Sequence, residues 1–291
     1  MISDSNPINR CFDVERPLFS EKDITDARRK LEDLIQAFKS GVSGSTEHRA
    51  TSLARGLQIF ASRGVRKDET APQLFVSSLN GNIINCNGYA YTLMAAAHEM
   101  DWSVALRTAS DHIWVYCDNF NVDWENTKDD NSMERTYGPF TTHNTDDTIQ
   151  AIFLLNRGHD WTHNAPADYE AALNLNPNLV SVRSCLGAFY CNHKLDYQKG
   201  LGFYNQEQEF QNGFRSRLLL SNIAEAKAKL IRARLLDEKR KPLENELADV
   251  EKDCDESEKS FQALDSSIEE SIKKQNGETR RIAQDLREGI Q

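Results

Sequence analysis

The central segment of the chain reads GYAYTLMAAAHEM (residues 88–100), WSVALRT (102–108), HIWVYC (112–117) and NVDW (121–124). The first stretch is apolar over a helical length, which predicts a buried helix. The later stretches are short and contain β-branched and aromatic residues, which predicts strands. Because one helix is followed by several strands in order, we expect an α+β unit with an antiparallel sheet.

Two helices are predicted before this core, within residues 1–64. The first begins at Ser20, with Asp23 three residues later as in a capping box, and ends at the sequence Lys39-Ser40-Gly41. The second covers residues 46–63. The core itself is assigned to residues 65–160, and neither of the two preceding helices carries visible chemistry.

Residues 161–213 return to a helical pattern. A small residue beside a leucine, Leu186-Gly187, and tyrosines spaced to interlock two antiparallel helices resemble one tetratricopeptide repeat. The pattern departs from that repeat at Lys199 and Gly200, where a small apolar residue is expected.

Residues 214–291 are predicted to form a helical extension, with breaks at Pro242 and at Asn276-Gly277. Apolar and small residues recur at heptad spacing over about four heptads: Leu243, Leu247, Val250, Cys254, Ser257, Phe261, Leu264 and Ile268. This seam indicates a helical hairpin or coiled coil. Two interpretations stay open, an extension that folds back on its own body and oligomerisation through the C-terminal helices.

The charge balance disfavours one class of partner. The chain of 291 residues holds 35 Lys and Arg against 45 Asp and Glu, a net charge of −10. An acidic surface repels phosphate backbones, so we expect no nucleic-acid partner. No apolar run approaches the ~20 residues that a membrane helix needs, so no membrane association is expected.

The cysteines and the first residues bear on location. Six cysteines are scattered without a CxxC pair, which argues against structural zinc and favours free thiols in a reducing compartment. The sequence MISDSNPINR at the N-terminus has no apolar signal segment. We expect a cytoplasmic or nuclear protein, with secretion by a route that reads no signal peptide left open.

Three residues form a candidate catalytic triad. Cys86 immediately precedes the buried helix, where the helix dipole and unpaired backbone N–H groups stabilise a thiolate. His112 opens a strand 26 residues later, and Asp123 lies 11 residues beyond it in the next strand. His112 would take and return the thiol proton, and Asp123 would hold the imidazole. The alternative is that all three are packing residues.

Neighbouring residues are candidates for the substrate cleft. Asn85 or Asn87 would contribute to an oxyanion hole, unless they only cap the following helix. Trp114 is a candidate for the wall of the cleft or for the core. His159 and His163 have the i,i+4 spacing of a metal pair, but no third ligand is evident, so no metal and no cofactor are predicted.

The same segment resembles the transglutaminase-like (papain-like) superfamily, whose members place a Cys before a helix, then a His-x-Trp strand and an Asp strand. The resemblance is greatest to the menin family and covers about 110 of the 291 residues. It is carried by the following segments: Lys67-Asp68, Leu74-Phe75, Gly81, Cys86-Asn87-Gly88-Tyr89-Ala90, Ser110-Asp111-His112-Ile113-Trp114-Val115, residues 153–158 (FLLNRG) and Asn176-Pro177. It implies a transglutaminase-like core and a groove around His112 that accepts an extended peptide.

Two functions follow from these observations. The first is acyl transfer on a protein or peptide amide through Cys86, as in a protease, a glutamine deamidase or a transglutaminase. The second is a menin-like peptide-binding scaffold without catalysis. Vertebrate menins lack the cysteine and hold a threonine where Asp123 falls here, whereas this chain has a complete candidate triad.

Overall fold

The computed structural model describes residues 2–42, 48–68, 74–109, 112–123, 126–137, 140–159, 165–210, 217–238, 244–259 and 266–288. The chain is mostly helical with a small antiparallel sheet, which confirms the predicted α+β class. It divides into a first unit of residues 1–135 and 140–179 and a second unit of residues 136–139 and 180–291. The division after residue 179 falls inside the predicted helical segment 161–213.

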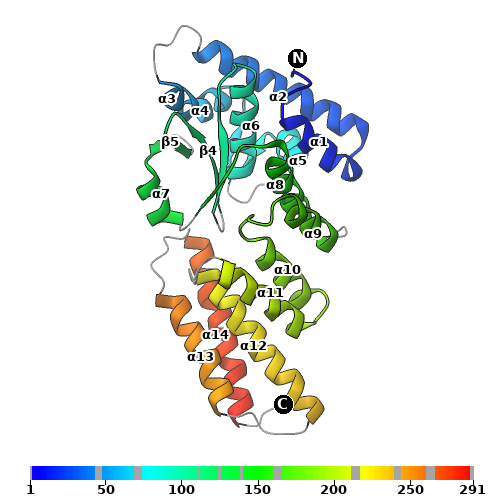
Figure 1. Cartoon of the computed structure of the whole chain (residues 1–291), viewed down its shortest axis with the longest axis vertical. Coiled ribbons are helices and arrows are strands. Elements are labelled where there is room, and N and C mark those ends of the chain that lie inside the picture. Colours follow the sequence, from blue (N-terminus) through cyan, green and yellow to red (C-terminus); the bar gives the residue numbers. More distant parts are fainter. Residues whose placement is uncertain are drawn as a thin grey trace. The chain divides into compact units, whose positions relative to one another are not determined.

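The first unit combines helices with the sheet (Figure 1). Its helices are α1 (Ile8–Glu15), the 3-10 turn η1 (Arg16–Leu18), α2 (Glu21–Val42), α3 (Arg49–Ala54), α4 (Gly56–Ala61), α5 (Phe75–Gly81), α6 (Cys86–His98), α7 (Asp130–Tyr137, the last two residues of which belong to the second unit), α8 (Asp146–Gly158) and α9 (Ala165–Leu175). A two-residue parallel pair joins β1 (Arg66–Lys67) to β2 (Ile83–Ile84).

The main sheet is antiparallel throughout, in the order β6-β5-β4-β3-β7. Its strands are β3 (Ala105–Thr108), β4 (Ile113–Cys117), β5 (Phe120–Asp123), β6 (Asn126–Lys128) and β7 (Thr141–His143). The first three confirm the strands predicted at 102–108, 112–117 and 121–124. β6 and β7 flank them, at three residues each.

Helix α6 is the centre of this unit. All residues from Gly88 to Ala97 are buried, as the apolar sequence predicts. The helix packs on β4 and β3 on one side and on α2 on the other (Figure 1). Since α6 begins at Cys86, the predicted nucleophile lies at the N-terminus of this buried helix.

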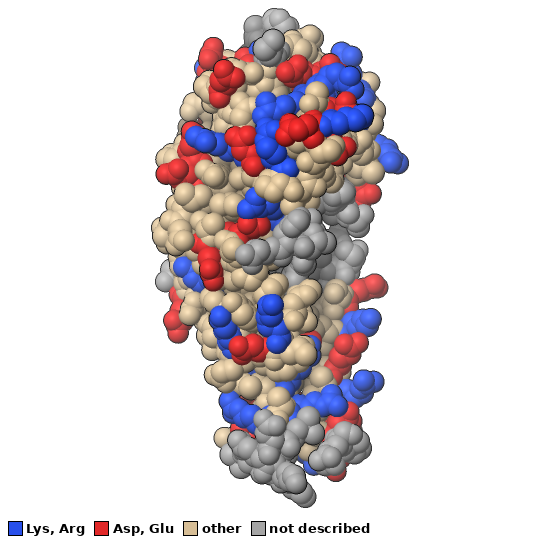
Figure 2. Space-filling model, turned by 90° about the vertical axis from the view of Figure 1, so that its right-hand side faces the viewer, with Lys and Arg blue, Asp and Glu red and all other residues tan. Residues whose placement is uncertain are grey.

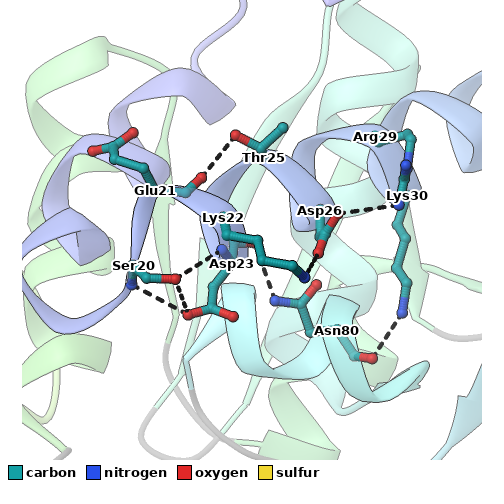
Figure 3. Close-up of polar contacts among 9 residues, drawn as sticks. All are labelled: Ser20, Glu21, Lys22, Asp23, Thr25, Asp26, Arg29, Lys30 and Asn80. Atoms are coloured by element: carbon teal, nitrogen blue, oxygen red, sulfur yellow. Dashed lines mark hydrogen bonds and ion pairs between the residues drawn. The ribbon is translucent and has the colours of Figure 1, made fainter.

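Helix α2 begins at the predicted capping box. The Ser20 hydroxyl accepts the Asp23 backbone N–H, and the Asp23 carboxylate accepts the Ser20 backbone N–H, both at 3.2 Å (Figure 3). The predicted stop at residues 39–41 falls one residue before Val42, the last residue of α2. A Cβ at Gly41 would lie 2.9 Å from Ile59 Cδ1, so this glycine lets α2 approach α4 closely.

The segment predicted as one helix over residues 46–63 forms two. A turn at Arg55 separates α3 from α4. A Cβ on Gly56 would lie 2.5 Å from Leu93 Cδ2, so the second helix starts where its backbone meets α6. Residues 43–47 lie outside the described residues.

The second unit is helical in its described residues. It contains α10 (Val182–Asn192), α11 (Tyr197–Phe210), α12 (Arg217–Glu238), α13 (Glu244–Lys259) and α14 (Ser266–Glu288). Helices α10 and α11 pack through two glycines. A Cβ on Gly187 would overlap the Tyr204 ring, and a Cβ on Gly200 would overlap Cys191 Sγ. Glycine therefore fills the position where the repeat pattern calls for a small residue.

Helices α12, α13 and α14 pack on one another within the chain. The described members of the heptad seam, Leu247, Val250, Cys254 and Ser257, are at most 1% exposed. Leu247 and Val250 share an apolar cluster with Ala283 of α14. The side chains of Leu243, Phe261, Leu264 and Ile268 and the predicted break at Pro242 lie outside the described residues.

The predicted break at Asn276-Gly277 is wrong, because α14 runs through both residues. Asn276 is fully buried, and its amide oxygen accepts the Ser221 hydroxyl at 2.8 Å. An interhelical hydrogen bond thus satisfies a residue type that otherwise favours turns.

Candidate functional site

The local sequence places the Cys86 thiol at the start of α6. Asn85 is the N-cap in an extended conformation, and its side-chain oxygen accepts the Gly88 backbone N–H at 3.0 Å. Cys86 is the first residue of the helix and is half-buried. Its sulfur lies where the helix dipole favours a negative charge and where solvent still reaches the residue.

Strand register brings His112 and Asp123 to the same face of the sheet. Val115 pairs with Val122, so Trp114 lies opposite Asp123, and His112 follows two residues away on the same face. His112 Nε2 and Asp123 Oδ1 are 2.7 Å apart. Both side chains are nearly buried, with exposed fractions of 9% and 5%.

The His112 ring also has a side-chain hydrogen bond with Cys86. Since Nε2 is engaged with Asp123, Nδ1 is the nitrogen left for the thiol. The three predicted residues therefore form one connected group, with the imidazole in the middle. The sequence distance of 37 residues between Cys86 and Asp123 is closed by the packing of α6 on β4.

Burial and hydrogen bonds act in opposite directions on the protonation of this pair. Burial lowers the pKa of His112, but its hydrogen bonds to Asp123 and Cys86 outweigh burial and raise the pKa from 6.5 to about 10. Burial raises the pKa of Asp123, whereas His112 and Lys128 lower it, with a net result of about 2. At neutral pH the pair is an imidazolium beside a carboxylate.

The predicted cleft residues take different positions. Asn85 caps α6, as the alternative interpretation expects of it. Asn87 lies at the thiol, because its side-chain oxygen is 3.8 Å from Cys86 Sγ. Trp114 is only 1% exposed and stacks on the His112 ring, with centroids 5.8 Å apart and planes at 26°. Trp114 thus packs behind the imidazole.

Residues that the sequence analysis missed surround Asp123 and its side of the sheet. Lys128 Nζ lies 3.0 Å from Asp123 Oδ2, so both carboxylate oxygens are engaged. Asn121 accepts the Trp114 indole N–H at 2.7 Å and the Arg107 guanidinium at the same distance. Asn121 is recognisable from the sequence, because it precedes Asp123 by two positions in β5 and therefore lies on the same face of the strand. Lys128 is not, because it approaches Asp123 only through the pairing of β6 with β5.

Another histidine of the sheet shows the contrast between a structural and a reactive environment. His143 is fully buried, and burial lowers its pKa to about 4. Its two ring nitrogens contact the Thr108 hydroxyl at 2.8 Å and the Asn176 amide at 3.1 Å. A neutral ring between two uncharged partners is a packing element.

The described part of the chain bears on two arrangements, those that metal sites and membrane-spanning helices require. No group of three or more His, Cys, Asp or Glu side chains there has the arrangement of a metal site. His159 has a pKa lowered by burial to about 4, and His163 and Asp160 lie outside the described residues. Among the described helices, none combines the length and the apolar character of a membrane span.

Charges of both signs are mixed on the surface. On the face shown in Figure 2, the described Lys and Arg side chains alternate with Asp and Glu. Along α2, Lys22 and Arg29 both contact Asp26, at 2.6 and 3.1 Å (Figure 3). Over its described residues, this face presents no continuous basic surface of the kind that binds nucleic-acid backbones.

Comparison of the chain with protein-family models, with curated proteins and with solved structures gave no match. The residues and the geometry of the site itself therefore indicate what the protein does.

Proposed function

We propose that the first unit is a thiol enzyme with a transglutaminase-like core, which transfers an acyl group from a protein or peptide amide through Cys86. The observation that carries this proposal is the connected group of Cys86, His112 and Asp123 at the start of a buried helix. A nucleophile in contact with a base, and a base held by a third residue, is the arrangement required for covalent acyl transfer.

In the first half of the reaction, Cys86 Sγ attacks the acyl carbonyl carbon and a C–S bond forms. The thiol proton resides on His112, and the carbonyl electrons move to oxygen. When the tetrahedral intermediate collapses, the C–N bond breaks and His112 gives its proton to the leaving amine. The product on the protein is a thioester.

In the second half, water or an amine attacks the thioester. His112 takes a proton from the incoming nucleophile, the C–S bond breaks, and the thiol regains a proton from His112. Asp123 keeps the imidazole oriented and stabilises its charged form throughout. Proteolysis, deamidation and cross-linking share these steps and differ in the acyl donor and in the second nucleophile.

Two further aspects of the proposal concern location and cofactors. All six cysteines are free, which suits a cytoplasmic or nuclear compartment. The mechanism needs no cofactor, because the thiol, the imidazole and the carboxylate supply the nucleophile, the proton transfer and the orientation. A menin-like scaffold remains the alternative, in which the same groove binds a peptide without reacting.

Alkylation by iodoacetamide tests the proposal, since it requires a thiolate. Cys185 is an internal reference, because it is half-buried like Cys86. Burial raises the pKa of Cys117 to about 12 and of Cys191 and Cys254 to about 11, so these thiols stay protonated. We expect Cys86 to react at least about tenfold faster than Cys185 at pH 7, as peptide mass spectrometry will show.

The His112→Asn variant is the companion measurement. It removes the imidazolium, so the rate at Cys86 should fall at pH 7 while the rate at Cys185 stays constant. Equal and slow alkylation of both cysteines in the wild-type protein would remove the enzyme proposal. A stable thioester on Cys86 from one of a panel of acyl-donor peptides would identify the substrate class.

A further inference from the structure

A chain of hydrogen bonds runs from the thiol into the interior of the first unit. Cys86 Sγ lies 3.8 Å from Asn87 Oδ1. The Asn87 amide nitrogen donates to Asn156 Oδ1 at 3.3 Å, and the Asn156 amide nitrogen donates to the Tyr91 hydroxyl. These residues come from α6 and α8, so the chain ties the reactive end of one helix to the side of another.

The inner end of this chain is rigidly held. Tyr91 is fully buried, and its ring contacts Phe75 of α5 and Phe153 of α8 edge-on, with centroids 5.6 and 4.9 Å away. Asn156 is 5% exposed, one of the few polar residues on the buried side of α8. Packing already fixes the conformations of the Tyr91 and Asn156 side chains, so little additional conformational entropy is lost when they position Asn87.

The hydrogen bonds that link Cys86, Asn87, Asn156 and Tyr91 can all point in either direction. A carboxamide has an acceptor end and a donor end, and a hydroxyl can accept or donate. In the direction observed, the Asn87 side-chain oxygen faces the Cys86 sulfur. In the reverse direction, Tyr91 donates to Asn156, Asn156 donates to Asn87, and the Asn87 amide nitrogen faces the sulfur. This reversal needs only a rotation of each carboxamide.

The reversed direction requires that Tyr91 keep its proton. Burial raises the pKa of Tyr91 well above its usual value, and the nearby Cys11, Glu15 and Cys86 raise it further. The hydroxyl is therefore neutral at every working pH and remains a donor. A charged partner at the other end of the chain, a thiolate or an oxyanion, selects the donor direction because hydrogen bonds to charges are the stronger ones.

We propose that Asn156 and Tyr91 are positioning residues that present the Asn87 amide as a hydrogen-bond donor to the oxyanion formed at Cys86. The inference rests on the proposed acyl transfer and assigns its oxyanion donor. Asn87 adjoins the nucleophile, so its amide reaches an oxygen carried on the carbon bonded to Sγ. Asn156 and Tyr91 do not touch the reacting atoms and act through Asn87.

Two reactions of Cys86 separate this role from a merely structural one. Acylation by 4-nitrophenyl acetate passes through a tetrahedral oxyanion, whereas alkylation by iodoacetamide does not. We expect Tyr91→Phe and Asn156→Leu to slow acylation about tenfold or more and to change alkylation less than about threefold. The Tyr91→Phe variant keeps the ring and its packing, so it remains informative if the Asn156 variant folds poorly.

Tyr89→Phe is the matched control. Tyr89 is a buried tyrosine of the same helix, and its hydroxyl donates to the Leu53 carbonyl at 3.3 Å, away from the chain. Both rates should be unchanged in this variant. The double variant Asn87→Ala/Tyr91→Phe should be acylated no more slowly than Asn87→Ala alone, because the two residues act in series.

The outcomes separate the two proposals. An unchanged ratio of acylation to alkylation in Tyr91→Phe, with wild-type Cys86 reacting selectively, overturns the positioning role and leaves the thiol enzyme in place. An equal fall of both rates also overturns it, because the chain would then only hold the thiol. A wild-type protein whose Cys86 is acylated no faster than Cys185 overturns the proposed function itself.

Discussion

His112 and Asp123 link folding to pH in opposite directions. The pKa of His112 is raised from 6.5 to about 10, so its stabilising contribution is complete below pH 6.5 and is lost as the pH rises to about 10. The pKa of Asp123 is lowered from 3.8 to about 2, so its contribution is complete above pH 3.8 and is lost as the pH falls to about 2. The pair therefore stabilises the fold most between about pH 3.8 and pH 6.5, where both contributions are complete.

From this linkage we expect Asp123→Asn to lower the free energy of unfolding at pH 7 by about 3 kcal/mol, because it leaves a buried cation without its counter-ion. The deficit should shrink by pH 10, where His112 is losing its charge in the wild-type protein. Urea unfolding at both pH values measures it. Asp130→Asn, at the start of α7, is the control, since Asp130 contacts Arg107 and Asn121 of the same sheet instead. A deficit that is equal at pH 7 and pH 10 would contradict the coupling.

Glu15 predicts a second pH dependence. It is 2% exposed, and its carboxylate accepts the backbone N–H groups of Phe75 and Val76 at 2.7 and 2.9 Å. Burial nevertheless raises its pKa from 4.5 to about 7. Stability should therefore fall as the pH rises from about 4.5 to about 7, by on the order of 1–3 kcal/mol.

The Glu15→Gln variant should remove most of this fall, because glutamine does not ionise. Glu21→Gln is the control, since the Glu21 side chain is 75% exposed and should leave the slope unchanged. Denaturant midpoints at pH 5 and pH 8 measure the effect. Equal slopes in the wild-type protein and in Glu15→Gln would show that Glu15 does not titrate in this range.

The sequence predicts the outer part of the candidate site better than its interior. Cys86, His112 and Asp123 are recognisable because each lies at a helix or strand boundary, and local patterns mark those boundaries. Asn156 and Tyr91 enter the site only because side chains of α8 and α6 meet, although the two residues are 65 positions apart in the sequence. Such non-local contacts leave no periodic signal in a single sequence.

At the scale of elements, local periodicity predicted α6 and strands β3 to β5, whose residues alternate or recur over several positions. It missed β6 and β7, which have three residues each and exist through pairing with β5 and β3. It also misread Asn276-Gly277 as a helix break. Glycine disfavours a helix only mildly, at about 1 kcal/mol, so packing decides whether the helix continues.

Two glycines of α11 give a paired prediction. A Cβ on Gly200 would overlap Cys191 Sγ and lie 2.8 Å from the Gly187 carbonyl, whereas a Cβ on Gly202 would meet nothing within 4 Å. We expect Gly200→Ala to lower the free energy of unfolding by about 1–3 kcal/mol through overpacking. Gly202→Ala should raise it by up to about 1 kcal/mol through helix propensity. Circular dichroism during urea unfolding measures both, and effects of the same sign would contradict the packing of α10 on α11.

For the whole molecule, the chemistry and the helical extension belong to different units. Every residue of the proposed reaction lies in the first unit, from Cys86 to Asn156. The heptad seam lies in the second unit, and its described members, residues 247–257, are buried against helices of the same chain. The sequence left open whether this seam folds back or joins two chains, because both arrangements require the same apolar spacing.

Truncation of the seam tests which arrangement holds. Leu247 is 1% exposed and packs with Ala228 of α12 and Ala283 of α14. We expect Leu247→Ala to lower the free energy of unfolding by about 2–4 kcal/mol, the cost of a buried cavity. The mass in solution, measured by light scattering, should stay the same, because the lost contacts lie within one chain. Asn245→Ala, at an exposed position of α13, should change neither quantity. A Leu247→Ala protein of half the wild-type mass would show instead that the seam joins two copies.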